Sequence, residues 1–370
     1  MRTGAAKEYK SRYLDNNKDI QFINLVAAIS EIYYSGDKDK LSKWFSMRGN
    51  LASMHYMSYQ GVGYGNVAAA VAAPFSTKTY LGSKVTDINY EDPANTIVSF
   101  TKNGVARKVA AKTVLVTVSL GVLKAGSIAF TPSLPSWKQD AINNMGFGIL
   151  NKCVMQWHDE DAMVWPEDVH WFEMITPSTH TSGQWTTFSN PSKFKGVPML
   201  VGWIGANYAR LMETQTDKEI VDDVMKHLQA MFPTIRRPDK VIITRWGQEE
   251  NIRGTYSFKK VGRDWSYDSY YLKKSVGRVW FAGEATATSW YASAIGAWKS
   301  GEEAAQGIAK ELLVSGRRAS SSQPSSQLRD DNAHDWKSTS TADLLASSSS
   351  VSSGHLWYSA FVGLVLGCFL

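Results

Sequence analysis

The chain is poor in cysteine and carries no block of charges of one sign. Its only cysteines, Cys153 and Cys368, lie in a predicted strand and in a terminal apolar segment, which argues against a disulfide framework or a metal site, and we expect no metal. The formal charge is +6, but the basic residues are scattered among acidic ones. This pattern is typical of a solvated surface, so we expect no nucleic acid partner.

Two N-terminal signatures are also missing. Residues 1–10 contain no apolar run of the kind found in a secretory signal peptide. No Gly-x-Gly-x-x-Gly turn with a following acidic residue opens the chain, and Gly61, Gly63 and Gly65 have a different spacing and follow no buried strand. We therefore predict no dinucleotide-binding turn of standard form within these 370 residues.

What is present is a large apolar and aromatic content, 44% and 12% of the 370 residues. Such a chain can bury an extensive core, and we expect an enzyme-sized body of roughly two domains. The many large rings fit either a deep aromatic-lined pocket or plain core packing. The last residues form an uncharged apolar segment, 355–370, which is shorter than the roughly 20 residues that span a bilayer.

Apolar periodicity predicts a mixed α/β chain. Asn66 is predicted to cap its helix, Ser35-Gly36-Asp37 to stop the first helix, and Asn103-Gly104 to form a tight turn between two strands. The strand at 113–118 is apolar at most positions, as in a parallel strand covered on both faces. The predicted helices span 20–34, 67–73, 137–145, 217–231 and 294–313, and the predicted strands span 85–90, 96–100, 109–118, 150–157, 199–204, 241–246 and 279–282.

The most specific feature is the strand, turn and helix at 279–301. A buried strand delivers Gly283 and Glu284 to the carboxyl edge of a sheet, and a helix N-terminus follows. Glycine allows close backbone approach to a ligand, and a carboxylate can accept hydrogen bonds from ribityl or ribose hydroxyls. Ser293 and Ala294 keep that approach open. The alternative is an ordinary strand-to-helix turn with a solvated glutamate.

The runs Val279-Trp-Phe-Ala-Gly-Glu-Ala285 and Ser293-Ala-Ile-Gly-Ala-Trp-Lys-Ser-Gly301 resemble the C-terminal FAD signature of the polyamine and monoamine oxidase family. Further segments agree with that family in order and spacing, and together they cover roughly residues 40–307. These segments are 117–124 with 128–135, 147–152, which bears the family's active-site lysine, and 253–257.

The resemblance implies FAD, oxidation of an amine to an imine, and reoxidation of the flavin by oxygen to hydrogen peroxide. By similarity, Lys152 holds a water near flavin N5, Trp246 and Tyr256 lie close to the flavin, and the backbone of Val85 meets the adenine portion. Ser293 stands where many members have the second ring of an aromatic cage. Linear di- or polyamines are the expected substrates, and FAD is expected to be non-covalent because no cysteine lies near the signature.

The implied architecture is an incomplete FAD-binding Rossmann-like domain interleaved with a substrate domain built on a mixed or antiparallel sheet and helices. We expect the ADP-binding part to be encoded upstream of Met1. The alternatives are a lysine demethylase-like oxidase and a catalytically impaired, membrane-tethered relative. The expected segments are 1–75 (helical part of the substrate domain), 76–148 (FAD-binding), 149–272 (substrate), 273–315 (FAD-binding), 316–354 (disordered Ser-rich linker) and 355–370 (apolar C-terminal tail). The tail resembles a GPI signal or a tail anchor, which would associate the protein with a membrane. The alternative is a cytoplasmic protein.

Overall fold

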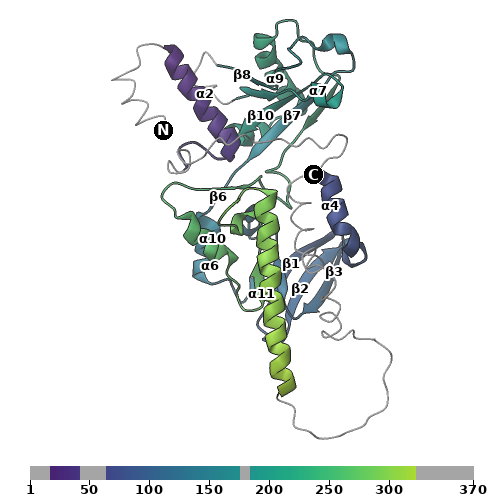
Figure 1. Cartoon of the computed structure of the whole chain (residues 1–370), viewed down its shortest axis with the longest axis vertical. Helices are drawn as coiled ribbons and strands as arrows, with labels where there is room; N and C mark the ends of the chain where they lie inside the picture. Colours follow the sequence, from purple (N-terminus) through teal and green to yellow (C-terminus); the bar gives the residue numbers. More distant parts are fainter. Residues whose placement is uncertain (1–16, 42–63, 176–183, 322–370) are drawn as a thin grey trace.

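The computed structural model describes residues 17–41, 64–175 and 184–321. A five-stranded sheet with α2 and α9 lies at one end, and a four-stranded sheet with α10 and α11 lies at the other (Figure 1). The mixed α/β fold expected from the sequence is confirmed. No helix in these ranges is long and apolar enough to cross a membrane. Segment 355–370 lies outside the described residues, so the predicted membrane contact stays a prediction.

The five-stranded sheet is antiparallel throughout, in the order β11-β7-β10-β9-β8. Along β7 the burial alternates, so that Cys153 and Met155 point into the core and Lys152 points to the opposite face. Helix α9 (Asp217–Met231) adds its buried face to this core, as its apolar spacing requires. The strands are β7 (Leu150–Gln156), β8 (Trp171–Glu173), β9 (Thr187–Ser189), β10 (Met199–Gly205) and β11 (Lys240–Ile243).

The four-stranded sheet has the order β3-β2-β1-β5, with β5 parallel to β1. Asn103 and Gly104, both at positive φ, form the two-residue turn between β2 and β3, which confirms the predicted hairpin. Both residues thus have the backbone conformation of a type I′ turn, in which asparagine and glycine are favoured. The strands are β1 (Ser83–Asn89), β2 (Thr96–Lys102), β3 (Val105–Ala111) and β5 (Ala129–Thr131).

The single strand predicted at 109–118 is wrong, because the chain divides there into two strands with different partners. β3 is largely exposed and pairs only with β2, whereas β4 (Val114–Val116) leaves the meander and pairs in parallel with β13 (Val279–Phe281). Its parallel pairing agrees with the apolar pattern. The break falls at Lys112 and Thr113, two polar residues that separate the apolar residues on either side, and the pairing partner changes there.

Three predicted helices need correction. α2 (Asn17–Tyr34) ends before Ser35 as predicted, but Val26 and Ile29 are exposed, whereas Leu25, Ala28 and Ile32 are buried. Asn66 lies inside α4 (Tyr64–Ala72) and is not its cap. α11 (Ala294–Ser321) continues past residue 313, so the linker boundary predicted at 315 falls within a helix (Figure 1). Residues 322–354 of that linker lie outside the described residues.

Helix α9 is the most accurate helix prediction, since its bounds match and only its cap was missed. Thr216, one residue before Asp217, accepts a hydrogen bond from the backbone N–H of Glu219, whose side chain accepts one from the backbone N–H of Thr216. The remaining helices and strands are α5 (Leu120–Lys124), α6 (Ser136–Asn144), α7 (Ser192–Lys195), α8 (Ala206–Glu213), α10 (Trp265–Lys273), η1 (Ala73–Lys78), η2 (Glu160–Ala162), η3 (Glu284–Thr286), β6 (Gly146–Phe147) and β12 (Ser257–Phe258).

Candidate functional site

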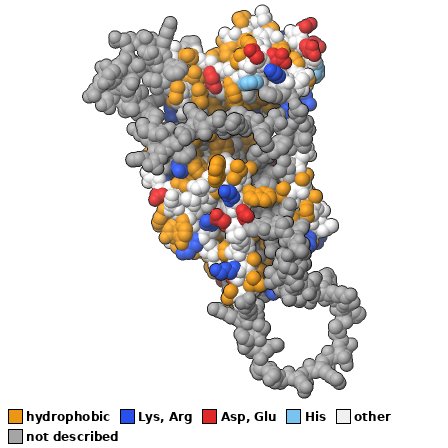
Figure 2. Space-filling model, viewed as in Figure 1, with side chains coloured by type: hydrophobic (Ala, Val, Ile, Leu, Met, Phe, Trp, Pro, Cys, Tyr) orange, Lys and Arg blue, Asp and Glu red, His pale blue; other side chains and the backbone are white. Residues whose placement is uncertain are grey.

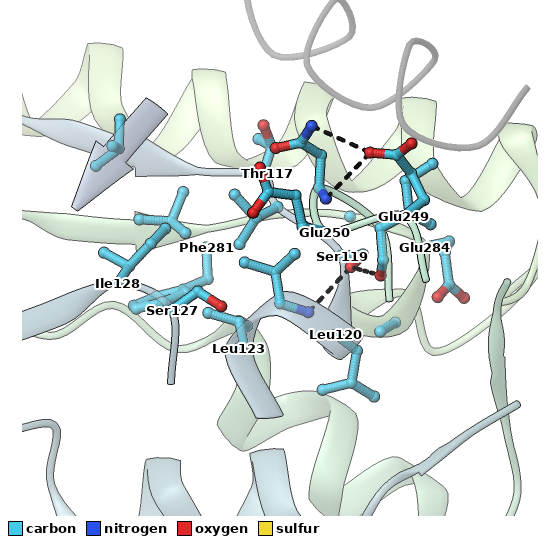
Figure 3. A pocket seen from close by; sticks show the side chains of 18 of the residues that line it. Thr117, Ser119, Leu120, Leu123, Ser127, Ile128, Glu249, Glu250, Phe281 and Glu284 are labelled. Carbon is cyan, nitrogen blue, oxygen red and sulfur yellow. Dashed lines mark hydrogen bonds between the residues drawn. The ribbon is translucent and has the colours of Figure 1, made fainter. Parts of the chain in front are cut away.

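A cavity of about 590 Å³ opens at the carboxyl ends of the parallel strands β4 and β13. This is the edge of a parallel sheet at which ligands usually bind, and the volume lies within the roughly 300–1,000 Å³ typical of small-molecule sites. Figure 3 shows Leu120, Leu123 and Ile128 on one side of the cavity, with Glu249 and Glu250 on the other. The cavity therefore joins segments that are far apart in the sequence.

The turn after β13 presents bare backbone to this cavity. Gly283 has φ 143°, a conformation that residues with a Cβ rarely adopt. Its N–H donates to Ser300 Oγ at 2.9 Å, and the Ser300 hydroxyl lies 3.0 Å from the Gly283 carbonyl oxygen, so α11 fixes the turn. A substituent at Gly283 would both strain the backbone and narrow the approach to the cavity wall.

Glu284 lines the cavity, but its carboxylate is held by the protein itself. Oε1 accepts from the backbone N–H of Ser257 at 3.1 Å, and Oε2 accepts from the Ser257 hydroxyl at 2.5 Å and from the N–H of Ala292 at 2.7 Å. Figure 3 shows its side chain directed away from Ile128 and Leu123. Burial raises the pKa of this carboxyl more than the three hydrogen bonds lower it. Both carboxylate oxygens thus already accept hydrogen bonds within the protein. A role of Glu284 toward ribityl or ribose hydroxyls stays a prediction.

The facing wall depends on Ser119, which also lines the cavity. Its Oγ accepts from the N–H of Val122 at 3.1 Å and thereby caps α5, and its hydroxyl donates to the carbonyl oxygen of Ile252 at 2.5 Å (Figure 3). Gly121 comes so close to Ile252 that a Cβ there would lie 2.7 Å from its carbonyl oxygen. Ser119 could have been recognised from its position just before the short helix.

These residues fit an extended cofactor with an apolar ring system. Val116, Leu120 and Phe281 supply an apolar floor, and Gly283 and Val85 also line the cavity. Charged side chains at the rim are paired within the protein, for example Lys84 with Glu250 at 2.6 Å. Among residues 17–41, 64–175 and 184–321, no group of His, Cys, Asp or Glu is arranged to hold a metal ion.

Of the eight residues proposed from the sequence, four line the cavity, namely Val85, Trp246, Gly283 and Glu284. Ser293 does not line it; its Oγ accepts from the N–H of Gly296 at 3.1 Å at the start of α11, and Ala294 is the first residue of that helix.

Tyr256 and Lys152 also lie outside the cavity lining. The Tyr256 hydroxyl is 3.0 Å from the carbonyl oxygen of Tyr33 and 3.2 Å from that of Ile32, at the end of α2, and burial raises its pKa. Lys152 Nζ lies 4.6 Å from the Trp203 ring centroid, and burial lowers the pKa of its ammonium group. The lowered pKa agrees with the expectation for a lysine beside aromatic rings, whereas its role toward flavin stays a prediction.

A buried polar network joins the backbone of Lys152 to the cavity, and no sequence pattern indicated it. The side chain of Asn151 accepts from Thr244 Oγ1 at 3.0 Å and from the N–H of Trp246 at 3.1 Å, and Thr244 Oγ1 accepts from the Lys152 N–H at 2.8 Å. Asn151 Nδ2 donates to Glu213 at 2.8 Å. These bonds fix the position of Trp246 relative to β7.

The family model for flavin containing amine oxidoreductases matches residues 9–309. The chain is 33% identical over 297 residues to polyamine oxidase 4 of Oryza sativa subsp. japonica, covering 80% of this chain and 58% of the relative. It is 36% identical over 250 residues to lysine-specific histone demethylase 1 homolog 1 of Arabidopsis thaliana, covering 66% and 28%. The chain thus spans less than two thirds of the length of these relatives.

A solved structure of cyclohexylamine oxidase from Brevibacterium oxydans IH-35A is similar in fold. The TM-score is 0.60 at 18% sequence identity, with 83% of this chain and 67% of that chain covered. At this identity the likeness concerns the fold alone.

Proposed function

Because the chain belongs to the flavin containing amine oxidoreductase family, whose members use FAD, we propose that it oxidises an amine to an imine, with a linear polyamine such as spermine or spermidine as the substrate. The observation that carries this proposal is the cavity in which the Gly283 turn, Val85 and Trp246 meet. Strands β1 and β13 and the 244–252 loop contribute these residues, so the cavity exists only in the folded chain.

In the proposed reaction the amine loses two electrons and two protons, and oxygen takes up two electrons and two protons to become hydrogen peroxide. FAD, when bound, supplies the two-electron acceptor between them. The protein's part is binding and orientation: Val116, Leu120 and Phe281 exclude water, and the Gly283 backbone allows close contact. Lys152, whose pKa is lowered by burial, is proposed to hold a water molecule beside the reacting centre.

The experiment starts with the purified full chain, from which flavin absorbance and acid-released flavin are measured. Peroxide release is then followed with spermine, spermidine, a monoamine and a methylated lysine peptide. We expect bound, acid-releasable FAD and the highest rate with a polyamine. Lys152→Met should reduce the rate at least tenfold and leave flavin binding intact, whereas Lys193→Met, an exposed lysine of α7, should change neither. Absence of flavin from the folded chain contradicts the proposal.

The similarity to a histone demethylase relative supports a second candidate, a methylated lysine side chain as the amine. The substrate panel separates the two, because only a demethylase prefers the peptide. A catalytically impaired relative would show neither flavin nor peroxide. Membrane attachment through residues 355–370 and the domain boundaries given above are proposals of the same kind, which membrane fractionation and limited proteolysis test.

A further inference from the structure

The face of the five-stranded sheet opposite its core carries a row of polar and aromatic side chains. Lys152 on β7 pairs with Trp203 on β10, Trp203 pairs with Thr187 on β9, and Thr187 pairs with Glu173 on β8. Residues that are paired across neighbouring strands project from the same face of a sheet. The row crosses four strands, so its ends lie about 14 Å apart at the usual strand spacing, and Figure 1 shows these strands in the upper sheet.

The β8 end of this row combines a carboxylate with two indole rings. Thr187 Oγ1 donates to Glu173 at 2.7 Å and fixes the carboxylate. Trp171, two residues before Glu173, projects from the same face and lies 5.8 Å from the Trp203 ring, centroid to centroid. The Trp203 indole N–H donates to Ser189 Oγ at 2.9 Å, so its orientation is also fixed.

This end of the row is accessible and suited to a cation. Trp171 is 41% exposed, and Glu173 is exposed as a residue although neighbouring atoms partly enclose its carboxylate. No basic side chain pairs with Glu173 among the ion pairs of the described residues. An ammonium group would gain both charge attraction from a carboxylate and cation–π attraction from the rings.

The raised pKa of Glu173 is the shift expected for a partly enclosed carboxylate that has no cation beside it. The atoms packed around the carboxylate raise its pKa to about 7, more than the Thr187 hydrogen bond lowers it. A bound ammonium group would favour the ionised form and offset this desolvation. At the other end of the row, burial lowers the pKa of Lys152.

We propose that Glu173, Trp171 and Trp203 form a binding site for the distal ammonium group of a linear di- or polyamine. The inference rests on the proposed function, and it assigns the part of the sheet that distinguishes polyamines from monoamines. The site determines specificity and does not take part in the chemical step, because Glu173 is at the end of the row farthest from Lys152.

Equilibrium binding under anaerobic conditions tests the site without turnover. The full chain is titrated with spermidine, a triamine, and with butylamine, a monoamine, by isothermal calorimetry at pH 8.5. Glu173→Gln should weaken spermidine binding about tenfold, as expected for loss of a charge-assisted contact, and change butylamine binding less than twofold. Glu160→Gln, an exposed carboxylate elsewhere in the same region, should leave spermidine binding unchanged.

Trp171→Leu is the second variant, since an exposed ring can be removed without opening the core, and it should weaken spermidine binding severalfold. Equal loss of spermidine binding in Glu173→Gln and Glu160→Gln would overturn the site, as would equal loss of spermidine and butylamine binding or no loss at all. Lack of spermidine binding by the unmodified chain would overturn it too. Failure of the oxidase proposal is separate, because it appears as missing flavin or peroxide while binding is intact.

Discussion

The carboxylate of Glu284 provides the sharpest test of how the turn after β13 is held. It accepts three hydrogen bonds, two of them from the backbone N–H groups of Ser257 and Ala292, and it is buried. Glu284→Ala leaves both N–H groups without an acceptor. The bond from Ser257 is buried and the bond from Ala292 is partly buried. A buried unsatisfied donor costs about 1–3 kcal/mol, so we expect the free energy of unfolding to fall by about 2–4 kcal/mol.

Glu284→Gln separates charge and geometry from simple loss of the side chain. The amide oxygen can replace Oε2, but the amide NH₂ then faces the Ser257 N–H, so one donor is unsatisfied and about 1–3 kcal/mol is lost. Ionised Glu284 is also less favoured in the folded than in the unfolded protein, because its pKa is raised. The wild-type protein therefore loses stability as pH rises above the unfolded pKa, and the glutamine variant should lack this loss.

Urea unfolding followed by tryptophan fluorescence measures these differences at several pH values. Glu250→Gln is the matched control, since that residue lies on the rim of the same cavity in an exposed ion pair, and a change below about 1 kcal/mol is expected. Alanine and glutamine variants of Glu284 as stable as the wild type would refute the assignment of its three hydrogen bonds.

Three further substitutions follow from the packing. Gly121→Ala should destabilise the fold strongly, because its Cβ would lie 2.7 Å from two backbone carbonyl oxygens. Gly65→Ala is the control: a Cβ there would meet nothing within 4 Å, so the variant should be neutral or more stable by up to about 1 kcal/mol. Equal thermal midpoints of the two variants would contradict this prediction. Lys138 is buried, donates to the carbonyl oxygens of Leu272 and Lys274, and has a pKa lowered to about 7 by burial. The free energy of unfolding of the wild type should therefore increase as pH rises from 7 toward 10. Lys138→Met should flatten that increase when urea unfolding is measured at several pH values. Thr216→Ala removes the cap of α9 and should lower the free energy of unfolding by about 1 kcal/mol. Thr216→Ser keeps the hydroxyl and should retain most of the wild-type stability in the same assay.

The surface expected from the charge pattern is consistent with the structure. On the face that Figure 2 shows, basic and acidic side chains are interspersed among the described residues. Ion pairs among the described residues, for example Arg237 with Asp222, agree with this mixture of charges. The expected absence of a nucleic acid partner stays a prediction.

Elements whose pattern is local could be predicted from the sequence alone. The period of 3.6 in α9 and the Asn103-Gly104 turn depend on neighbours a few residues away, and both are where the pattern placed them. The Gly283-Glu284 turn also follows from a buried strand that ends in glycine. Family and cofactor could therefore be inferred from short motifs.

Which of these elements meet depends on the tertiary structure. The pairing of β4 with β13, the donors from Ser257 and Ala292 to Glu284, and the link from Asn151 to Trp246 join residues that are separated in the chain, and no local period encodes them. The face of α2 that is buried likewise depends on what packs against it. The register between strands also places Glu173 in one row with Lys152. Strand pairing, and not spacing along the chain, determines which side chains lie opposite one another.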